Sequence, residues 1–234
     1  MNQIRSLAKY QLSDNRNGLL IFYAILIAIA LVMIAISSWE AASGHTSLSG
    51  SSIVFLFVIG LNCFRPSFLF AQANNISRRT FYFATILSLV GLAVIVSLAD
   101  FVMDSVMSRY PFYYGIFDQI YAAPGMTKIL WTMAMLTFSA SLGWMITMLY
   151  YRANAWVKVL ISVSPLVFII LASYIHQLTG GTFGYRVLDL LARAFGFSAE
   201  TPNPYPAIAT LTLTVLVIWA INYLLMRKTP VRAY

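Results

Sequence analysis

Charge is the first property that this sequence has little of. Asp, Glu, Lys and Arg make up only 9% of its 234 residues, whereas about 25% is usual in a soluble globular domain. Hydrophobic residues make up 60%, and the mean hydropathy is +0.79. A soluble fold of this composition would expose many apolar side chains to water. The composition therefore excludes a soluble globular domain and predicts a polytopic membrane protein.

Reactive and metal-binding residues are also scarce. Cys63 is the single cysteine, which excludes an intramolecular disulfide and a multi-cysteine metal site. The sequence has no GxxxxGK[ST] phosphate loop, no HExxH and no GxSxG, and we expect no paired carboxylates inside the membrane. The chain is therefore not expected to be an enzyme, to hydrolyse a nucleotide by itself or to hold a cofactor or metal.

Long apolar runs are abundant. Each is about 20 residues long, the length that a helix needs to cross a hydrocarbon core of about 30 Å. We expect an all-α fold consisting of one transmembrane domain over residues 1–234, with six spans. The expected spans are 19–39, 52–72, 81–103, 129–151, 157–177 and 207–226.

The basic residues are distributed unevenly along the chain. Ten of the 15 Lys and Arg lie before the first span, in the second and fourth connections, and in the tail 227–234. By the positive-inside rule, this predicts that both the N-terminus and the C-terminus are cytoplasmic. The net charge of +8 then indicates contact with anionic lipid headgroups rather than with nucleic acid.

The segment 1–18 is amphipathic on a helical wheel, with apolar residues on one face and basic residues on the other, namely Arg5, Lys9 and Arg16. This pattern predicts a cytoplasmic interfacial helix that lies in the headgroup layer and ends at Asn17-Gly18. The alternative is a frayed basic tail.

The second expected span has polar residues on one face, Asn62, Arg65 and Gln72, and Pro66 follows the arginine. Proline removes a backbone donor and disfavours helical geometry at the residue before it, so we expect the helix to bend or open near Arg65. An ionised side chain inside a membrane favours a functional role, here in a translocation pathway. The alternative is that Arg65 snorkels to the inner interface.

Two further features concern the later spans. In the fourth span, Ser139 and Gly143 form a small-xxx-small pair, which predicts the close approach of another helix. The connection between the third and fourth spans is aromatic, and we expect it to form a belt at the outer membrane interface rather than a cargo-binding patch. Its aromatic residues are Tyr110, Phe112, Tyr113, Tyr114, Phe117 and Tyr121.

The long connection between the fifth and sixth spans contains a patterned segment, 184–197. Apolar residues share one side of its helical wheel, and Arg186, Asp189 and Arg193 form a stripe opposite, at spacings of three and four. Asp189 can pair with both arginines. The pattern predicts an outer amphipathic helix that is too short to span. Its apolar face would lie in lipid or against the outer ends of spans five and six.

The connection between the second and third spans, 73–80, carries the most specific motif. The sequence ANNISRRTFYFAT resembles the (N/G)-(I/V)-S-R-(R/K)-T-F-(F/Y) loop of small bacterial ABC-2-type permeases. The six spans, the amphipathic N-terminal segment and the amphipathic segment 184–197 agree with that family. In place of the glycine that many members have near the turn, this sequence has two asparagines. The resemblance assigns ATPase coupling to Asn74, Asn75, Ile76, Ser77, Arg78, Arg79 and Thr80.

The resemblance implies that the chain is the permease subunit of an ATP-driven exporter in a bacterial plasma membrane. It also implies that the segment with Arg186, Asp189 and Arg193 acts as an outer gate. The partners it implies are a separate ATP-binding cassette subunit, which would bind ATP and Mg, and a second permease chain, identical or related, that completes the pathway. The alternative function is a small-molecule binding membrane module, such as a substrate-capturing uptake component, or an immunity or sensor protein. The alternative reading of Arg78 and Arg79 is that they are ordinary positive-inside charges.

Overall fold

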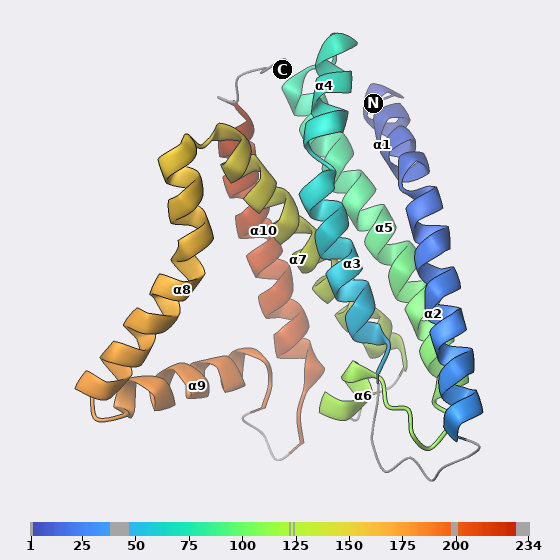
Figure 1. Ribbon diagram of the computed structural model, residues 1–234, viewed down its shortest axis with the longest axis vertical. Helices are drawn as coiled ribbons and strands as arrows, with labels where there is room; N and C mark the ends of the chain where they lie inside the picture. Colours follow the sequence, from blue (N-terminus) through green and yellow to red (C-terminus); the bar gives the residue numbers. More distant parts are fainter. Residues whose placement is uncertain (1, 38–46, 122, 124, 198–200, 228–234) are drawn as a thin grey trace.

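The computed structural model describes residues 2–37, 47–121, 123, 125–197 and 201–227. The regular structure of these residues is helical (Figure 1). The helices are α1 (Asn2–Asp14), α2 (Arg16–Ser37), α3 (Ser49–Asn62), α4 (Arg65–Ala73), α5 (Arg78–Met107), α6 (Ile116–Ile120), α7 (Gly125–Arg152), α8 (Ala155–Leu178), α9 (Thr182–Ala194) and α10 (Pro204–Arg227).

Six helical stretches in the described residues are long and apolar enough to cross a membrane, which confirms the predicted all-α fold with six spans. They are Gln3–Ile36, Ser49–Ala73, Arg78–Met107, Gly125–Arg152, Ala155–Leu178 and Pro204–Arg227. Each of the last five extends a few residues beyond the expected span at both ends. Of the expected tail 227–234, only Arg227 lies among the described residues.

The core of the molecule is a bundle in which α7 packs against α3, α5 and α10. Helices α3 and α7 approach each other most closely at two glycines. A Cβ atom on Gly60 would lie 2.1 Å from the carbonyl oxygen of Ala140, and one on Gly143 would lie 2.4 Å from that of Phe57. In addition, the Ser139 hydroxyl donates to the Ile53 carbonyl oxygen at 2.7 Å. The close helix approach that Ser139 and Gly143 predict is confirmed.

The N-terminal helix differs from the expectation in its end and in what covers its apolar face. Helix α1 ends at Asp14 and α2 begins at Arg16, so Gly18 lies inside α2. The two helices follow one another as a nearly straight rod beside α5 (Figure 1). Leu7 and Ala8 are buried in the protein core. The predicted end at Asn17-Gly18 was therefore wrong, because the apolar face packs on α5, and the helix continues into the span.

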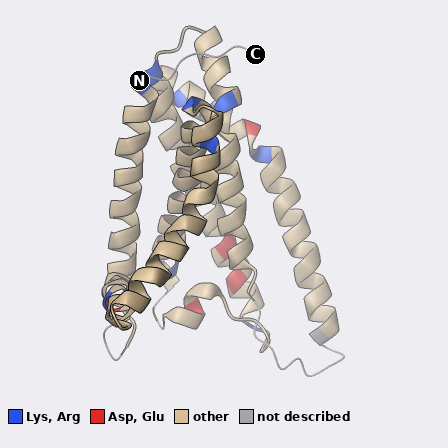
Figure 2. Ribbon diagram, turned by 60° about the vertical axis from the view of Figure 1, so that its left-hand side comes forward, with Lys and Arg blue, Asp and Glu red and all other residues tan. Residues whose placement is uncertain are grey.

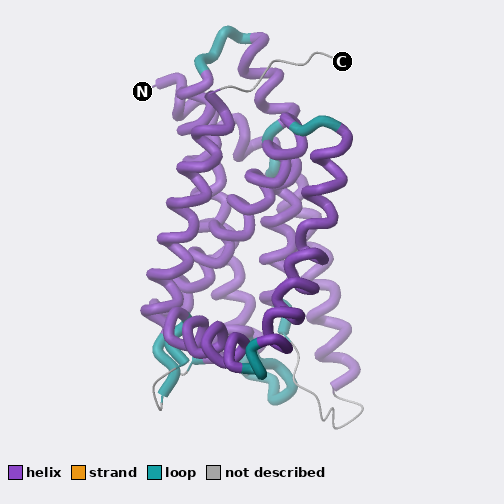
Figure 3. The backbone as a smooth tube through the Cα atoms, turned by 90° about the vertical axis from the view of Figure 1, so that its left-hand side faces the viewer, coloured by secondary structure: helices purple, strands orange, loops and turns teal. Residues whose placement is uncertain are grey.

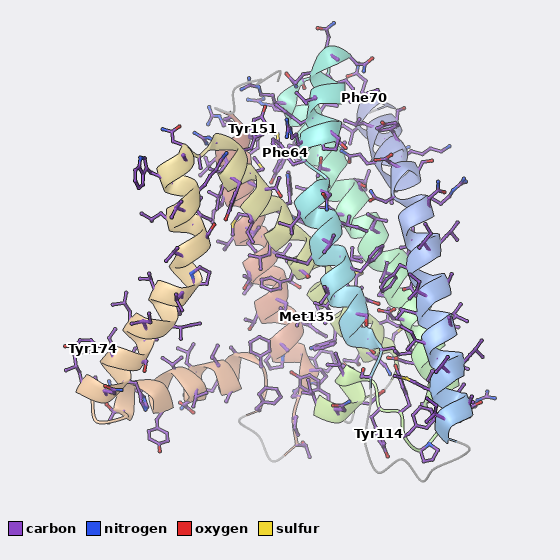
Figure 4. All side chains as sticks on the ribbon, in the orientation of Figure 1. Phe64, Phe70, Tyr114, Met135, Tyr151 and Tyr174 are labelled. Carbon is purple, nitrogen blue, oxygen red and sulfur yellow. The ribbon has the colours of Figure 1, made fainter. Side chains whose placement is uncertain are left out.

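The second span is broken, as Pro66 predicted. Helix α3 ends at Asn62 and α4 begins at Arg65. Between them, the ring of Phe64 is completely buried, and it meets the ring of Tyr151 on α7 edge-on with a centroid distance of 5.4 Å (Figure 4). Proline at the start of α4 leaves no donor for the preceding turn, and the aromatic packing fixes the break in one place.

The aromatic connection packs mainly against the protein. Four of its six aromatic residues are buried, and Tyr114 is exposed. The Tyr121 hydroxyl donates to the Phe195 carbonyl oxygen at 2.7 Å. The four buried rings fill two core clusters, one with α2 and one with α7 and α10, and the belt at the outer membrane interface stays a prediction. The buried residues are Phe112, Tyr113, Phe117 and Tyr121.

Helices α8 and α9 stand apart from the bundle and form what we call the arm (residues 155–194). In Figures 1 and 3, α8 leaves the bundle beside α7, and α9 returns across the opposite end of the molecule toward α10. Neither helix contains a buried residue. Gly180 and Gly181 have φ angles of +58° and +88°, and this left-handed geometry, which glycine adopts without strain, makes the turn between the two helices. Tyr174 marks the outer corner of the arm (Figure 4).

Candidate functional site

Residues 74–80, which are the turn between α4 and α5 and the first residues of α5, project from the end of the molecule at which α1 begins and α10 ends (Figures 1 and 3). Most Lys and Arg residues lie at this end, and the acidic residues of α5 and α6 lie toward the other end (Figure 2). The asymmetry that the sequence predicted in its connections is thus an asymmetry of the folded molecule. We call residues 74–80 the polar turn.

The first half of the polar turn closes α4 with a Schellman motif. The Ile76 N–H donates to the Ala71 carbonyl oxygen at 2.9 Å, and the Asn75 N–H donates to that of Gln72 at 3.1 Å. Asn75 has a φ of +55°, a conformation in which asparagine is one of the few favoured side chains besides glycine. Asn75 therefore adopts the left-handed conformation and takes the position of the glycine that the family motif often has near this turn.

The second half of the polar turn starts α5. Ser77 is the N-cap, and its hydroxyl oxygen accepts a hydrogen bond from the Thr80 N–H at 3.2 Å, which satisfies one of the free donors of a helix start. The Arg78 guanidinium donates to the Arg227 carbonyl oxygen at the end of α10, at 2.9 Å. The turn is thus closed by hydrogen bonds on both sides and tied to α10.

The seven residues assigned to coupling differ in what they offer to a partner. Asn74, Asn75, Ser77 and Arg79 are exposed, whereas Ile76, Arg78 and Thr80 are half-buried. Ile76 packs against the main core of the bundle. The exposed set consists of amides, a hydroxyl and one guanidinium, so its charge is positive and its donors match carboxylate and carbonyl acceptors. Arg79 is the residue of this set that carries the charge.

An apolar groove of about 440 Å³ runs beside the polar turn, between α1 and α4. At its edge the rings of Tyr10 and Phe70 stack with a centroid distance of 4.6 Å, and Phe70 points toward α1 in Figure 4. Both rings are 43% exposed. The sequence analysis missed this groove, because nothing in the chain signals that α1 would lie next to α4.

The structure does not bring the three polar residues of the second span to one place. Asn62 lines a polar cavity beside α1 and α5. Gln72 donates to the Ile76 carbonyl oxygen at 3.2 Å and so belongs to the polar turn. Arg65, the first residue of α4, is exposed. Since α3 and α4 are separate helices, the single helical face on which the three residues were placed is interrupted between Asn62 and Arg65.

The segment 184–197, expected to be helical, largely overlaps α9, Thr182–Ala194, on which Arg186, Asp189 and Arg193 are all exposed. Arg193 and Asp189 form the predicted ion pair, with an N–O distance of 2.9 Å. The apolar face of α9 is exposed as well. Only its C-terminal end is attached to the bundle, where the Thr210 hydroxyl of α10 donates to the Ala194 carbonyl oxygen at 2.9 Å.

A buried charge cluster at the end opposite the polar turn was missed. The Lys128 ammonium lies 3.1 Å from a carboxylate oxygen of Asp104 and also pairs with Asp118. One turn along α5, Asp100 is 5% exposed and accepts hydrogen bonds from the hydroxyls of Tyr23, at 2.9 Å, and Ser52, at 2.8 Å. Asp100 and Asp104 thus lie one helical turn apart near the end of α5.

The i, i+4 spacing of Asp100 and Asp104 near the end of an apolar run was the available signal, since such residues share a helix face. Tyr113 completes the cluster by donating from its hydroxyl to Asp104. Burial, followed by the hydrogen bond to Asp104, raises the pKa of Tyr113 above its ordinary value, so its hydroxyl keeps the proton that it donates.

Taken together, the six apolar helical stretches and the polar turn define a multi-pass helical membrane protein. The chain matches no protein-family model, no curated protein and no solved structure. Among the described residues, no group of three or more His, Cys, Asp or Glu side chains is arranged to hold a metal ion.

Proposed function

We propose that the chain is the permease subunit of an ATP-driven exporter of the ABC-2 type. Two such chains, identical or related, form the translocation pathway in a bacterial plasma membrane with both termini in the cytoplasm. Each binds a separate ATP-binding cassette subunit through the polar turn, and that subunit binds ATP and Mg. The chain itself performs no reaction, and its substrate class is not specified by the motif.

The observation that carries this proposal is the polar turn. It projects at the basic end of the molecule (Figures 1 and 2), and its sequence is the part of the chain that resembles the family motif. A turn that is to transmit motion has to be stiff, and this one is closed by a Schellman motif, an N-cap and a bond to α10. Its exposed donors remain available to a partner.

The same contacts suggest how force would reach the spans. The polar turn joins α4 to α5 directly, and Arg78 joins it to the end of α10. A displacement of the turn by a bound ATPase therefore moves the cytoplasmic ends of three spans together. Because α4 is separated from α3 by the break at Cys63 and Phe64, α4 can follow the turn while α3 stays packed on α7.

The test is retention of the ATPase by charge-reversed variants. We expect Arg79→Glu to reduce the amount of copurifying ATPase about tenfold or more, because reversing the exposed charge turns an attraction into a repulsion. The double variant Arg78→Glu/Arg79→Glu would also break the bond to α10, so the single variant tests the exposed charge alone. Arg109→Glu, exposed at the other end of the molecule, is the matched control and should retain the ATPase.

The copurifying protein has to contain a phosphate loop and hydrolyse ATP, both of which are checked by mass spectrometry and a phosphate-release assay. Full retention of that protein by Arg79→Glu would overturn the assigned interface. Loss of it from Arg109→Glu as well would show that charge reversal disrupts the fold rather than the docking site.

A second candidate function, capture of a small apolar molecule, is favoured by a cavity of about 370 Å³ between α5, α7 and α10. Ligand sites usually have volumes of about 300–1,000 Å³ and are mostly apolar with a few polar groups. The hydroxyl oxygens of Thr137 and Thr212 supply such groups here, since both hydroxyl protons are donated to backbone carbonyls. Saturable, high-affinity binding of a small molecule by the isolated chain would favour this function over the exporter.

A further inference from the structure

A small polar cavity of about 160 Å³ lies where the broken second span passes α1 and α5. Irregular backbone at membrane depth is tolerated where it is buried in protein or lines a cavity, and broken spans are common at the binding sites of transporters. The break here supplies Cys63 and the flanking Asn62 to the cavity wall. The full lining is Gln11, Asp14, Asn15, Asn62, Cys63, Pro66, Ser67, Thr85, Ser88 and Leu89.

The deepest amide of the cavity lining is Gln11, which is only 4% exposed. Its amide nitrogen donates to the Thr85 hydroxyl at 3.2 Å, and the Thr85 hydroxyl in turn donates to the Phe81 carbonyl oxygen at 3.0 Å. Because Thr85 has used its single proton, Gln11 must present its NH₂ group to it. The Oε1 atom of Gln11 is left buried with no hydrogen-bond partner among the described residues.

The two asparagines of the lining are oriented in the same way. The Asn15 amide nitrogen donates to the Gln11 carbonyl oxygen at 2.8 Å, and the Asn62 amide nitrogen donates to the Val58 carbonyl oxygen at 2.8 Å. Backbone carbonyls only accept, so each asparagine must use its NH₂ group there. Each of these three amides therefore uses one of its two N–H donors on the protein, and its side-chain oxygen accepts no hydrogen bond from the described residues. Such an arrangement favours a ligand that supplies positive charge or donors.

The charge and the size of the cavity narrow the class of ligand. Asp14 is the charged residue among those that line it. A carboxylate, amide oxygens and hydroxyls are hard oxygen ligands, which suit hard cations better than softer transition metals. The single carboxylate of the lining balances one positive charge, which favours a monovalent cation over a divalent one. A volume of about 160 Å³ corresponds to about five waters at about 30 Å³ each, enough for a small cation with part of its hydration shell.

We infer that this cavity binds a small monovalent cation, an alkali metal ion or a protonated amine of methylammonium size, through the oxygens of Gln11, Asn15, Asn62 and Asp14. A bound cation would join the end of α1 to the break in the second span. The inference does not depend on the proposed exporter function, because the cavity lies within one chain and can be tested without an ATPase. Failure of one therefore leaves the other standing.

The test is thermal unfolding of the purified full chain in detergent, at constant ionic strength. Sodium, potassium or methylammonium chloride replaces N-methyl-D-glucammonium chloride, whose cation is too large for the cavity. A ligand that binds the folded state raises the melting temperature as its concentration rises. We expect at least one of the three small cations to do so, and the one that acts identifies the source as a metal ion or an amine.

The variants locate the binding site. Asn62→Leu changes an exposed lining residue, and Asp14→Asn removes the negative charge; each should weaken the apparent affinity for the cation about tenfold or more. Ser88→Ala removes a lining hydroxyl and serves if Asn62→Leu fails to fold. Gln119→Leu is the control, since it removes an amide that also donates to a backbone carbonyl but lies outside the cavity. It should respond as the wild type does.

Two results would overturn the inference. One is an unfolding temperature that is the same in all four salts. The other is a rise in unfolding temperature that has the same size and concentration dependence in Asn62→Leu and Asp14→Asn as in the wild type. Ser88→Ala takes the place of Asn62→Leu if that variant does not fold. In either case the stabilising ion would bind elsewhere.

Discussion

The bundle and the arm are both built from apolar helices of span length, yet they differ in what covers them. In the most apolar window of α7, 50% of the residues are buried inside the protein, whereas in that of α8 none is. The bundle helices meet through glycines, hydroxyls and a buried ion pair. The arm touches the rest of the chain mainly at its two ends.

This difference shows that hydropathy and packing are separate properties of a membrane helix. Lipid satisfies an apolar side chain as well as protein does, so an apolar run guarantees a span but not a neighbour. Contacts between spans require small residues or paired polar groups, and those are concentrated in α3, α5 and α7. We therefore expect substitutions in the bundle to change stability and equivalent substitutions in the arm to change it little.

The largest difference in the free energy of unfolding is expected between variants that break the ion pair of the bundle and variants that break the ion pair of the arm. Lys128→Met leaves Asp104 buried without its cation, and breaking a buried pair costs about 3–5 kcal/mol. Arg193→Met breaks the pair with Asp189, whose side chains are 72% and 57% exposed, and should cost about 0.5 kcal/mol or less. The measurement is the free energy of unfolding in mixed micelles. Equal losses in both variants would contradict the view that only the bundle relies on its own contacts.

A smaller difference in stability is expected when a larger side chain is introduced in the bundle and in the arm. Gly143→Val forces a side chain against the Phe57 carbonyl oxygen, which lies 2.4 Å from the position of a Cβ atom, and overpacking of this kind costs about 1–3 kcal/mol. Ser173→Val on α8 adds a similar volume at an exposed position. It should stay within about 0.5 kcal/mol of the wild type. Thermal unfolding of the two variants side by side checks this, and a stable Gly143→Val protein would disprove the tight α3–α7 contact.

The smallest change in stability is expected from cysteine probes, which report accessibility instead. In a Cys63→Ser background, Asp189→Cys on α9 should react with an impermeant thiol reagent from outside the cell. Ser97→Cys, at a position that is 1% exposed in the bundle, should not react. Both should unfold within about 1 kcal/mol of the parent. Absence of labelling at Asp189→Cys would contradict the predicted topology.

The Asp189→Cys variant also tests the hypothesis that α9 acts as an outer gate in the proposed exporter. If α9 moves with the ATP cycle, Asp189→Cys should react at different rates in the nucleotide-free and the ATP-trapped transporter. Equal rates would make the arm a static anchor, while leaving the topology unaffected.

The sequence by itself determined the features that depend on length and on local backbone chemistry. Six runs of sufficient length predicted six spans, because a helix satisfies its own backbone hydrogen bonds in lipid without help from distant residues. Pro66 predicted the break, because the missing donor and the restricted preceding residue act locally. Ser139 and Gly143 predicted a close helix contact, although not that α3 would make it.

Only the tertiary structure decided which polar groups meet. Asp104, Asp118 and Lys128 come from α5, α6 and α7, and the cavity collects Gln11, Asn62 and Ser88 from α1, α3 and α5. The aromatic connection was assigned to the interface because its rings suit that environment, but the same rings suit a protein core equally well. The physical reason is that burial depends on helix neighbours distant in sequence, which neither hydropathy nor helical periodicity encodes.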